Sequence, residues 1–209
     1  MMEAVVNWAT SLVETLGYAG VALLVALENL FPPIPSEVVL PLAGFVAASE
    51  EASIGGMVLA ATIGSMLGAY ALYGVSAAVG PIRLRRFVEK YGRWLRLGGD
   101  DLDRAEAWFD QKARTVVMIS RCVPLMRSLI SVPAGFRRMP LLQFSMYTLA
   151  GSLVWNLALV GAGYLLGENW KQAGQPVEVL QGVVLIAIVG AVAWFVWRRT
   201  VSPRLNRQR

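Results

Sequence analysis

The amino-acid sequence predicts an all-α fold: a polytopic membrane protein with three complete transmembrane helices and two opposed re-entrant helical hairpins in an inverted repeat. Three observations predict this fold. The 209 residues are 56% hydrophobic and 16% charged, with a mean hydropathy of +0.54, which is too apolar for an ordinary soluble domain. Some apolar stretches are uninterrupted and others are broken by prolines and charges. The broken stretches also match each other in sequence.

The uninterrupted apolar stretches are residues 54–80, 144–167 and 177–197. Each is roughly twenty residues or longer, and at about 1.5 Å per helical residue each can cross a hydrocarbon core of about 30 Å. Their one charge, Glu178, lies at an edge. We therefore expect these three stretches to be the complete transmembrane helices.

The interrupted apolar stretches are residues 17–48 and 113–136. Proline removes a backbone donor and clashes with the preceding helical turn, so neither stretch is expected to form one continuous helix. Each is predicted to be a re-entrant hairpin, which enters the bilayer, turns and returns on the same side. The predicted helix-breaking residues are Pro32, Pro33, Pro35 and Pro124.

Lysine and arginine predict the orientation. Residues 81–112 and the tail 198–209 are rich in both, and such segments face the cytoplasm. Residues 1–16 have neither; they are predicted to form an interfacial helix on the outer side, without a cleaved signal peptide. Residues 81–112 also carry apolar side chains, as an amphipathic segment on anionic lipids does. Nucleic-acid binding is the less favoured interpretation of the net charge of +5.

The two predicted hairpins resemble each other. Pro33 and the run Ala43-Gly44-Phe45 align with Pro124 and Ala134-Gly135-Phe136 at an offset of 91 residues (124 minus 33). Downstream, Gly64-Ser65 aligns with Gly151-Ser152 at an offset of 87 (151 minus 64). Because the hairpins enter from opposite sides, the halves are expected to form an inverted repeat, with a substrate site near the bilayer midplane. The alternative is chance recurrence of glycine and alanine.

Four charged residues lie within the hairpins: Glu28 and Glu37 in the first, Arg121 and Arg127 in the second. A charge at mid-membrane costs about 2.5–3.5 kcal/mol, so these side chains are expected to meet around a shared polar cavity. The arginines predict an anion site, because a guanidinium binds phosphate or carboxylate through two parallel hydrogen bonds. The glutamates are candidates for gating or proton coupling. The alternative is a set of static ion pairs, and Asn156 either lines the cavity or bonds a neighbouring backbone group.

The chain contains no histidine and a single cysteine, Cys122. A histidine-based triad, a multi-cysteine metal site and an internal disulfide are therefore excluded, and no cofactor or metal is expected. An intramembrane phosphatase would have to rely on Ser120, Ser128 or a carboxylate, which makes it a remote alternative. We expect a non-enzymatic protein.

Three motifs together resemble the DedA family of bacterial membrane proteins. They are Glu28-Asn-Leu-Phe-Pro-Pro-Ile-Pro-Ser-Glu37, the Gly-Ser-x-Leu-Gly-Ala-Tyr-x-x-Tyr run over residues 64–73, and Ser120-Arg-Cys-Val-Pro-Leu-Met-Arg127 followed by Pro133-Ala-Gly135. The first pattern is similar to that of the undecaprenyl-phosphate translocase branch. The resemblance implies opposed re-entrant hairpins and lipid transport, with the family's acidic positions at Glu28 and Glu37 and its arginines at Arg121 and Arg127. The second acid lies further along in some branches, so the role of Glu37 transfers less securely.

The leading functional hypothesis is therefore a transporter in the bacterial cytoplasmic membrane that flips undecaprenyl phosphate, with or without coupling to protons. A less selective phospholipid scramblase or a phosphatidylethanolamine flippase is the alternative. A purely structural membrane protein is a third interpretation. The expected partners are the lipid phosphate and anionic membrane lipids but no nucleic acid, and the sequence leaves open whether the chain forms a homo-oligomer.

Overall fold

The structure is a computed structural model that describes residues 2–30, 36–49, 52–91, 99–124 and 126–169, together with Ile186 and Gly190. Every regular element in these ranges is helical, which confirms the all-α prediction for them. The elements are α1 (Met2–Leu16), α2 (Tyr18–Leu30), α3 (Ser36–Ser49), α4 (Ile54–Tyr91), α5 (Gly99–Ser120), α6 (Met126–Leu129), α7 (Ser131–Phe136), α8 (Leu141–Leu166) and a 3₁₀ turn, Gly167–Asn169.

Several predictions fall outside the described residues. The predicted span 177–197, apart from Ile186 and Gly190, and the basic tail 198–209 lie there. So do the helix-breaking residues Pro32, Pro33 and Pro35.

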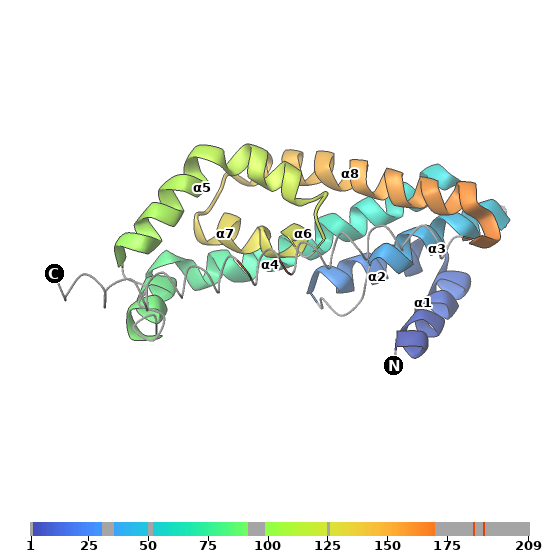
Figure 1. Ribbon diagram of the computed structural model, residues 1–209, viewed down its shortest axis with the longest axis horizontal. Coiled ribbons are helices and arrows are strands. Elements are labelled where there is room, and N and C mark those ends of the chain that lie inside the picture. Colours follow the sequence, from blue (N-terminus) through green and yellow to red (C-terminus); the bar gives the residue numbers. More distant parts are fainter. Residues whose placement is uncertain are drawn as a thin grey trace.

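Helices α4 and α8 form the frame of the molecule. Figure 1 shows them side by side along the long axis, running in opposite directions. Ile54–Pro81 and Leu141–Leu166 are long and apolar enough to cross a membrane. These helices correspond to the predicted spans 54–80 and 144–167.

A kink divides α4. Gly80 has φ 73° and ψ 164°, which is not helical, and Pro81 follows it. A positive φ is accessible to glycine at little cost, and proline is tolerated at the start of a new helical segment. The kink falls where the predicted transmembrane helix 54–80 meets the predicted cytoplasmic segment 81–112.

The shorter helices pack against this frame from its two ends. Helix α2 lies along α4 and α3 along α8 at one end, whereas α5 lies along α8 and α7 along α4 at the other. In Figure 1, α5 runs from the left end toward the middle, where the chain reverses and α6 and α7 return. The predicted hairpin 17–48 is thus two helices. Helix α5 runs without a break through residues 112 and 113, where the sequence suggested a segment boundary.

Two glycine contacts relate the halves of the chain. A Cβ at Gly44 in α3 would lie 2.0 Å from the carbonyl oxygen of Val160 in α8, and one at Gly135 in α7 would lie 2.4 Å from that of Tyr73 in α4. Gly44 and Gly135 are 91 residues apart (135 minus 44), and Tyr73 and Val160 are 87 apart (160 minus 73). These are the two offsets of the predicted repeat. In each contact, a glycine on a short helix of one half packs against a backbone carbonyl on the long helix of the other half.

Two apolar clusters are separated by buried polar side chains along α8. One cluster includes Phe144 and joins α4, α5, α7 and α8. The other includes Leu159 and Val160 and joins α1, α2, α3, α4 and α8. Between them, α8 buries Thr148, Ser152 and Asn156. The candidate site lies in this polar layer.

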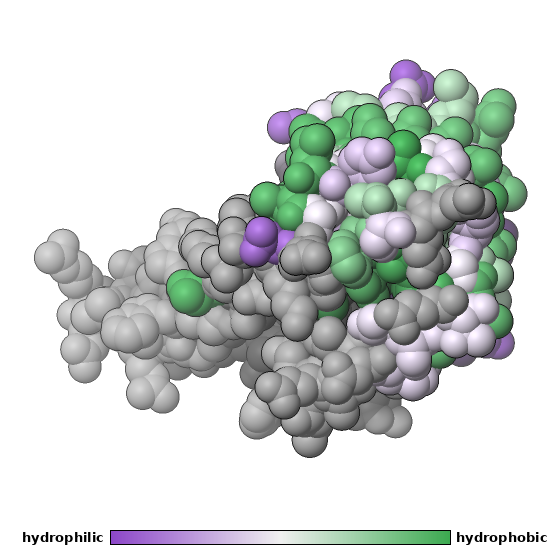
Figure 2. Space-filling view, turned by 90° about the vertical axis from the view of Figure 1, so that its right-hand side faces the viewer, coloured by the Kyte–Doolittle hydropathy of each residue, from purple (hydrophilic) through white to green (hydrophobic). Residues whose placement is uncertain are grey.

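The outer surface of the frame is strongly apolar. Leu59 and Leu67 on α4 and Leu142, Met146 and Leu165 on α8 are more than half exposed. Figure 2 shows hydrophobic residues, in green, over much of the described surface at the end where α3, α4 and α8 meet. An apolar exterior around a polar layer suits a lipid solvent and is unfavourable in water.

The crossing of α3 and α8 provides a test of this packing. A Cβ at Gly163 would lie 2.0 Å from the carbonyl oxygen of Pro41, whereas one at Gly161 would meet nothing within 4 Å. Gly163→Ala should therefore destabilise the purified protein by about 1–3 kcal/mol through overpacking, and Gly161→Ala should not. Thermal unfolding in detergent, followed by circular dichroism, measures the difference. Equal melting temperatures for the two variants would contradict the α3–α8 contact.

Candidate functional site

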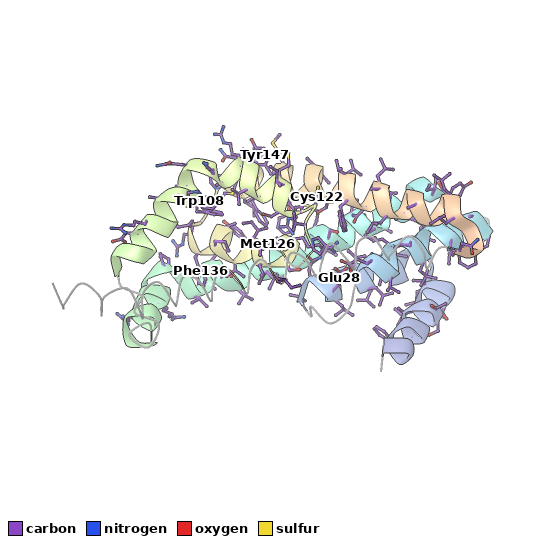
Figure 3. All side chains as sticks on the ribbon, viewed as in Figure 1. Glu28, Trp108, Cys122, Met126, Phe136 and Tyr147 are labelled. Atoms are coloured by element: carbon purple, nitrogen blue, oxygen red, sulfur yellow. The ribbon has the colours of Figure 1, made fainter. Side chains whose placement is uncertain are left out.

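A buried ion pair joins the two halves of the chain. Nη2 of Arg127 in α6 donates a hydrogen bond of 3.1 Å to Oε2 of Glu28 in α2. The Arg127 side chain is 5% exposed and that of Glu28 is 8% exposed. Figure 3 labels Glu28 at the end of α2 and Met126 at the start of α6, both near the middle of the molecule. Glu28 and Arg127 are two of the four charges that the sequence led us to expect close together, and they are in direct contact.

Arg121 is held differently, by neutral acceptors. Its Nη1 donates to the backbone oxygen of Arg127 at 2.7 Å, and its Nη2 donates to Oγ of Ser131 at 2.9 Å and Oγ1 of Thr148 at 3.2 Å. The guanidinium carbon also lies 5.6 Å from the ring centroid of Phe144, a cation–π contact. Arg121 is 2% exposed, and within the described ranges its Nε has no hydrogen-bond partner.

The turn between α5 and α6 places both arginines. At the end of α5 the hydrogen bonds tighten to the 3₁₀ pattern, as in Cys122 N–H to Ile119 O at 2.9 Å. Pro124 follows and has no N–H with which to continue the helix. The chain resumes as a helix at Met126, so Arg127 lies in the first turn of α6 while Arg121 extends from the end of α5. The predicted break at Pro124 is therefore present.

A second, neutral contact connects the same two segments. Oγ of Ser128 donates to Oδ1 of Asn29 at 3.3 Å, while Nδ2 of Asn29 donates to the carbonyl oxygen of Val25 at 2.9 Å. Asn29 and Ser128 are each adjacent in sequence to a member of the ion pair. The end of α2 and the helix α6 are thus joined through both a charged and a neutral side-chain pair.

Glu37 is buried at the start of α3 but does not join the pair. It is 4% exposed, and no residue in the described ranges forms an ion pair or hydrogen bond with its carboxylate. Its place in the first turn of α3 is electrostatically favourable, because a helix N-terminus carries partial positive charge. The structure therefore brings together three of the four charges that the sequence singled out.

Asn156 belongs to a separate polar cluster between α8 and α4. It is fully buried, and its Nδ2 donates to Oγ1 of Thr62 at 3.1 Å and to Oγ of Ser65 at 3.4 Å. Its Oδ1 has no partner among the described residues. The Nδ2 of Asn156 thus bonds side chains of another helix, and a role for Asn156 in lining a cavity stays a prediction.

Sequence reasoning considered Ser128 only for a phosphatase and missed three other polar residues of the site: Asn29, Ser131 and Thr148. One signal was available for the last of these. Thr148, Ser152 and Asn156 recur every four residues within an apolar span, which places them on one face of a helix. Ser131 and Ser128 gave no such signal, because their helices are short.

A second arginine–carboxylate pair lies at the surface. Nε of Arg137 donates to Oδ1 of Asp110 at 3.1 Å, and Nη2 of Arg137 bonds the other carboxylate oxygen. It connects α5 with the segment after α7, and both side chains are about one third to one half exposed. This pair provides a surface control for the buried one. The described residues contain no group of three histidine, cysteine or acidic residues that could hold a metal ion.

Residues 34–165 match the family model of the VTT domain. The chain is 45% identical over 177 residues to an alkaline phosphatase-like protein of Lactococcus lactis subsp. cremoris, covering 84% of this chain and 82% of that protein. It is 33% identical over 189 residues to undecaprenyl phosphate transporter A of Staphylococcus aureus, covering 90% and 93%. It is 29% identical over 207 residues to undecaprenyl phosphate transporter A of Bacillus subtilis, covering 97% and 96%.

No solved structure matches the chain. The family model covers well over half of the sequence, including α3, α4 and α8. The helical frame and the buried charges define a membrane protein with a polar site inside an apolar shell. The chain belongs to the VTT-domain family, also called the DedA family, which confirms the resemblance seen in its motifs.

The ion pair predicts strong energetic coupling between Arg127 and Glu28. Removing one partner of a buried pair leaves an uncompensated charge, which costs about 3–5 kcal/mol, so Arg127→Ala and Glu28→Ala should each destabilise the protein strongly. The double variant should lose much less than the sum of the two. The free energy of unfolding of all four proteins, measured in detergent, gives the coupling.

Arg137→Ala is the matched control, because an exposed ion pair contributes at most about 1 kcal/mol. Additive losses for Arg127→Ala and Glu28→Ala would contradict direct pairing.

Proposed function

We propose that this protein moves a lipid phosphate, and specifically undecaprenyl phosphate, across the bacterial cytoplasmic membrane without chemically changing it. The observation that carries the proposal is the buried Arg127–Glu28 pair between two segments of the chain that are 99 residues apart. Two relatives named undecaprenyl phosphate transporter A support the choice of lipid. A charge-bearing interior is costly in a membrane protein, and functional sites are where such charges usually occur.

The transport path would be formed by two opposed re-entrant hairpins. In this proposal α2 and α3 enter from the outer side, and α5 with α6 and α7 enters from the cytoplasm, so that their turns meet at mid-membrane. The repeated glycine contacts of Gly44 and Gly135 support an inverted repeat, since each hairpin packs against the long helix of the other half. The C-terminus would then lie in the cytoplasm.

Arg127 and Arg121 would bind the phosphate. The carboxylate of Glu28 and a phosphate are both oxyanions that suit a guanidinium, so the headgroup would take the place of Glu28 on Arg127. Once Arg127 binds the headgroup, Glu28 is proposed to take up a proton, and Glu37 is proposed to act as a second gating or proton-linked acid. The isoprenoid tail would stay in the lipid and the phosphate would stay in the polar interior of the protein, so that the charge is never exposed to hydrocarbon.

A neutralised pair tests the anion site while avoiding an unpaired buried charge. Arg127→Gln combined with Glu28→Gln should keep the protein folded but abolish transport of undecaprenyl phosphate into the opposite leaflet of reconstituted vesicles, because Arg127, the principal phosphate ligand, is then missing. Arg137→Gln combined with Asp110→Asn, at the surface pair, should transport normally. Full activity of the buried double variant would remove Arg127 as the headgroup ligand.

Two other activities are separated by their substrates and products. A less selective phospholipid scramblase would be inhibited equally well by phosphatidylethanolamine and by a lipid monophosphate, whereas a phosphatidylethanolamine flippase would be inhibited better by phosphatidylethanolamine. The relative named alkaline phosphatase-like protein raises the phosphatase alternative. In the described site, however, Ser131 accepts from Arg121 and Ser128 donates to Asn29, and neither hydroxyl bonds a residue that could act as its general base.

We therefore expect a lipid monophosphate to compete at lower concentration than phosphatidylethanolamine, because the guanidinium of Arg127 favours a headgroup with net negative charge over a zwitterionic one. We also expect no inorganic phosphate to appear during transport. Vesicle transport assays with unlabelled competitors, combined with a colorimetric phosphate assay, measure both. Equal competition would indicate a scramblase, and stoichiometric phosphate release would indicate a phosphatase.

A further inference from the structure

The helix α8 carries a polar face that the arginine site does not fully use. Thr148, Ser152 and Asn156 follow one another at intervals of four residues, and each is at most 4% exposed. The neighbouring residues Leu149, Leu153 and Leu157 are all more than 40% exposed. Over about 12 Å of helix, α8 therefore turns hydroxyl and amide groups inward and leucines outward.

Helix α4 supplies the opposite wall of this face. Thr62 and Ser65 are each 3% exposed, and both accept hydrogen bonds from the Asn156 amide. At the other end, Thr148 accepts from Arg121. We call the set Thr62, Ser65, Thr148, Ser152 and Asn156 the α4–α8 seam. It begins at the arginine cluster and runs along α8 toward the end of the molecule where α4 starts.

Two buried polar atoms, one beside the Thr148 end of the seam and one at its Asn156 end, have no hydrogen-bond partner in the described part of the chain. One is a donor, the Nε–H of Arg121, and the other is an acceptor, Oδ1 of Asn156. Arg121 is 2% exposed and Asn156 is 0% exposed. Buried polar groups are normally hydrogen-bonded, so an unpartnered donor and acceptor at one interface indicate a ligand that offers both functions. Water and a singly protonated phosphate monoester each do so.

We propose that the α4–α8 seam is the path along which the phosphate headgroup, with its water, passes between the arginine cluster and the outer face. This inference rests on the proposed function, because a headgroup path requires a transported headgroup. All five residues of the seam are neutral, and Arg121 lies next to it, at Thr148. Neutral hydroxyl and amide groups hold an anion weakly, and weak successive contacts are what release along a path requires.

The seam is closed in this conformation, since every side chain in it is buried. A headgroup can pass only when the seam opens to water. The opposing interpretation is that these small polar residues merely allow α4 and α8 to pack closely, as serine and threonine often do between membrane helices. The two interpretations differ in whether water and an anion ever reach Ser152.

Cysteine accessibility separates them. Cys122 is the single cysteine of the chain, so Cys122→Ser gives a background without thiols. In that background, Ser152→Cys and Ser65→Cys place a thiol on each wall of the seam. Val21→Cys is the matched control, because Val21 is equally buried but lies on α2 in an apolar cluster. The probe is 2-sulfonatoethyl methanethiosulfonate, an anion that reacts with thiolates in water.

In proteoliposomes, we expect both seam cysteines to react about tenfold or more faster than the Val21→Cys control, because only a hydrated thiol ionises readily. Added undecaprenyl phosphate should slow the reaction, and undecaprenol, which lacks the phosphate, should not. Ser65→Cys keeps the test informative if Ser152→Cys does not fold. Seam and control cysteines that react at the same rate would overturn the proposal in favour of packing.

Fast reaction without protection by undecaprenyl phosphate would also overturn it, since the seam would then be wet but outside the headgroup path. Neither result affects the proposed function, which is tested by the neutral Arg127/Glu28 double variant. Full transport by that variant would instead remove Arg127 as the headgroup ligand, and no transport of undecaprenyl phosphate by the unaltered protein would reject the function, whatever the seam cysteines do.

Discussion

The structure depends on the requirement that a charge buried in an apolar protein must be compensated. Arg127 and Glu28 meet this requirement through each other, and by doing so they join helices from the two halves of the chain. Their neighbours Ser128 and Asn29 add a neutral contact at the same place. The long helix α4 packs against both α2 and α6, which carry the pair, and apolar clusters lie on either side of the polar layer.

The two arginines have different surroundings and therefore different capacities. Arg121 bonds a carbonyl oxygen and two hydroxyls and lies over Phe144, which fixes the turn that presents Arg127. Arg127 instead holds a carboxylate, which another oxyanion can replace. In the proposed mechanism Arg121 thus mainly positions the turn, with its Nε available to a ligand, and Arg127 is the principal phosphate ligand. Family membership and composition alone would not separate these roles.

Much of this arrangement follows from the sequence. Uninterrupted apolar runs predicted α4 and α8, Pro124 predicted the end of α5, and the cost of burying charge predicted that Glu28 would find an arginine. Which arginine it pairs with depends on tertiary packing, which periodicity does not encode. For the same reason the sequence suggested a partner for Glu37, which the described residues do not supply. It also gave no reason for Ser131 to bind Arg121, since single serines are common in apolar helices.

The most direct test of the central claim is an experimental density map of the protein with undecaprenyl phosphate bound. The account predicts that phosphate oxygens lie within hydrogen-bonding distance of the Arg127 guanidinium and that the Glu28 carboxylate has moved away from it. A map in which the Arg127–Glu28 pair is intact while the headgroup binds elsewhere would contradict the account.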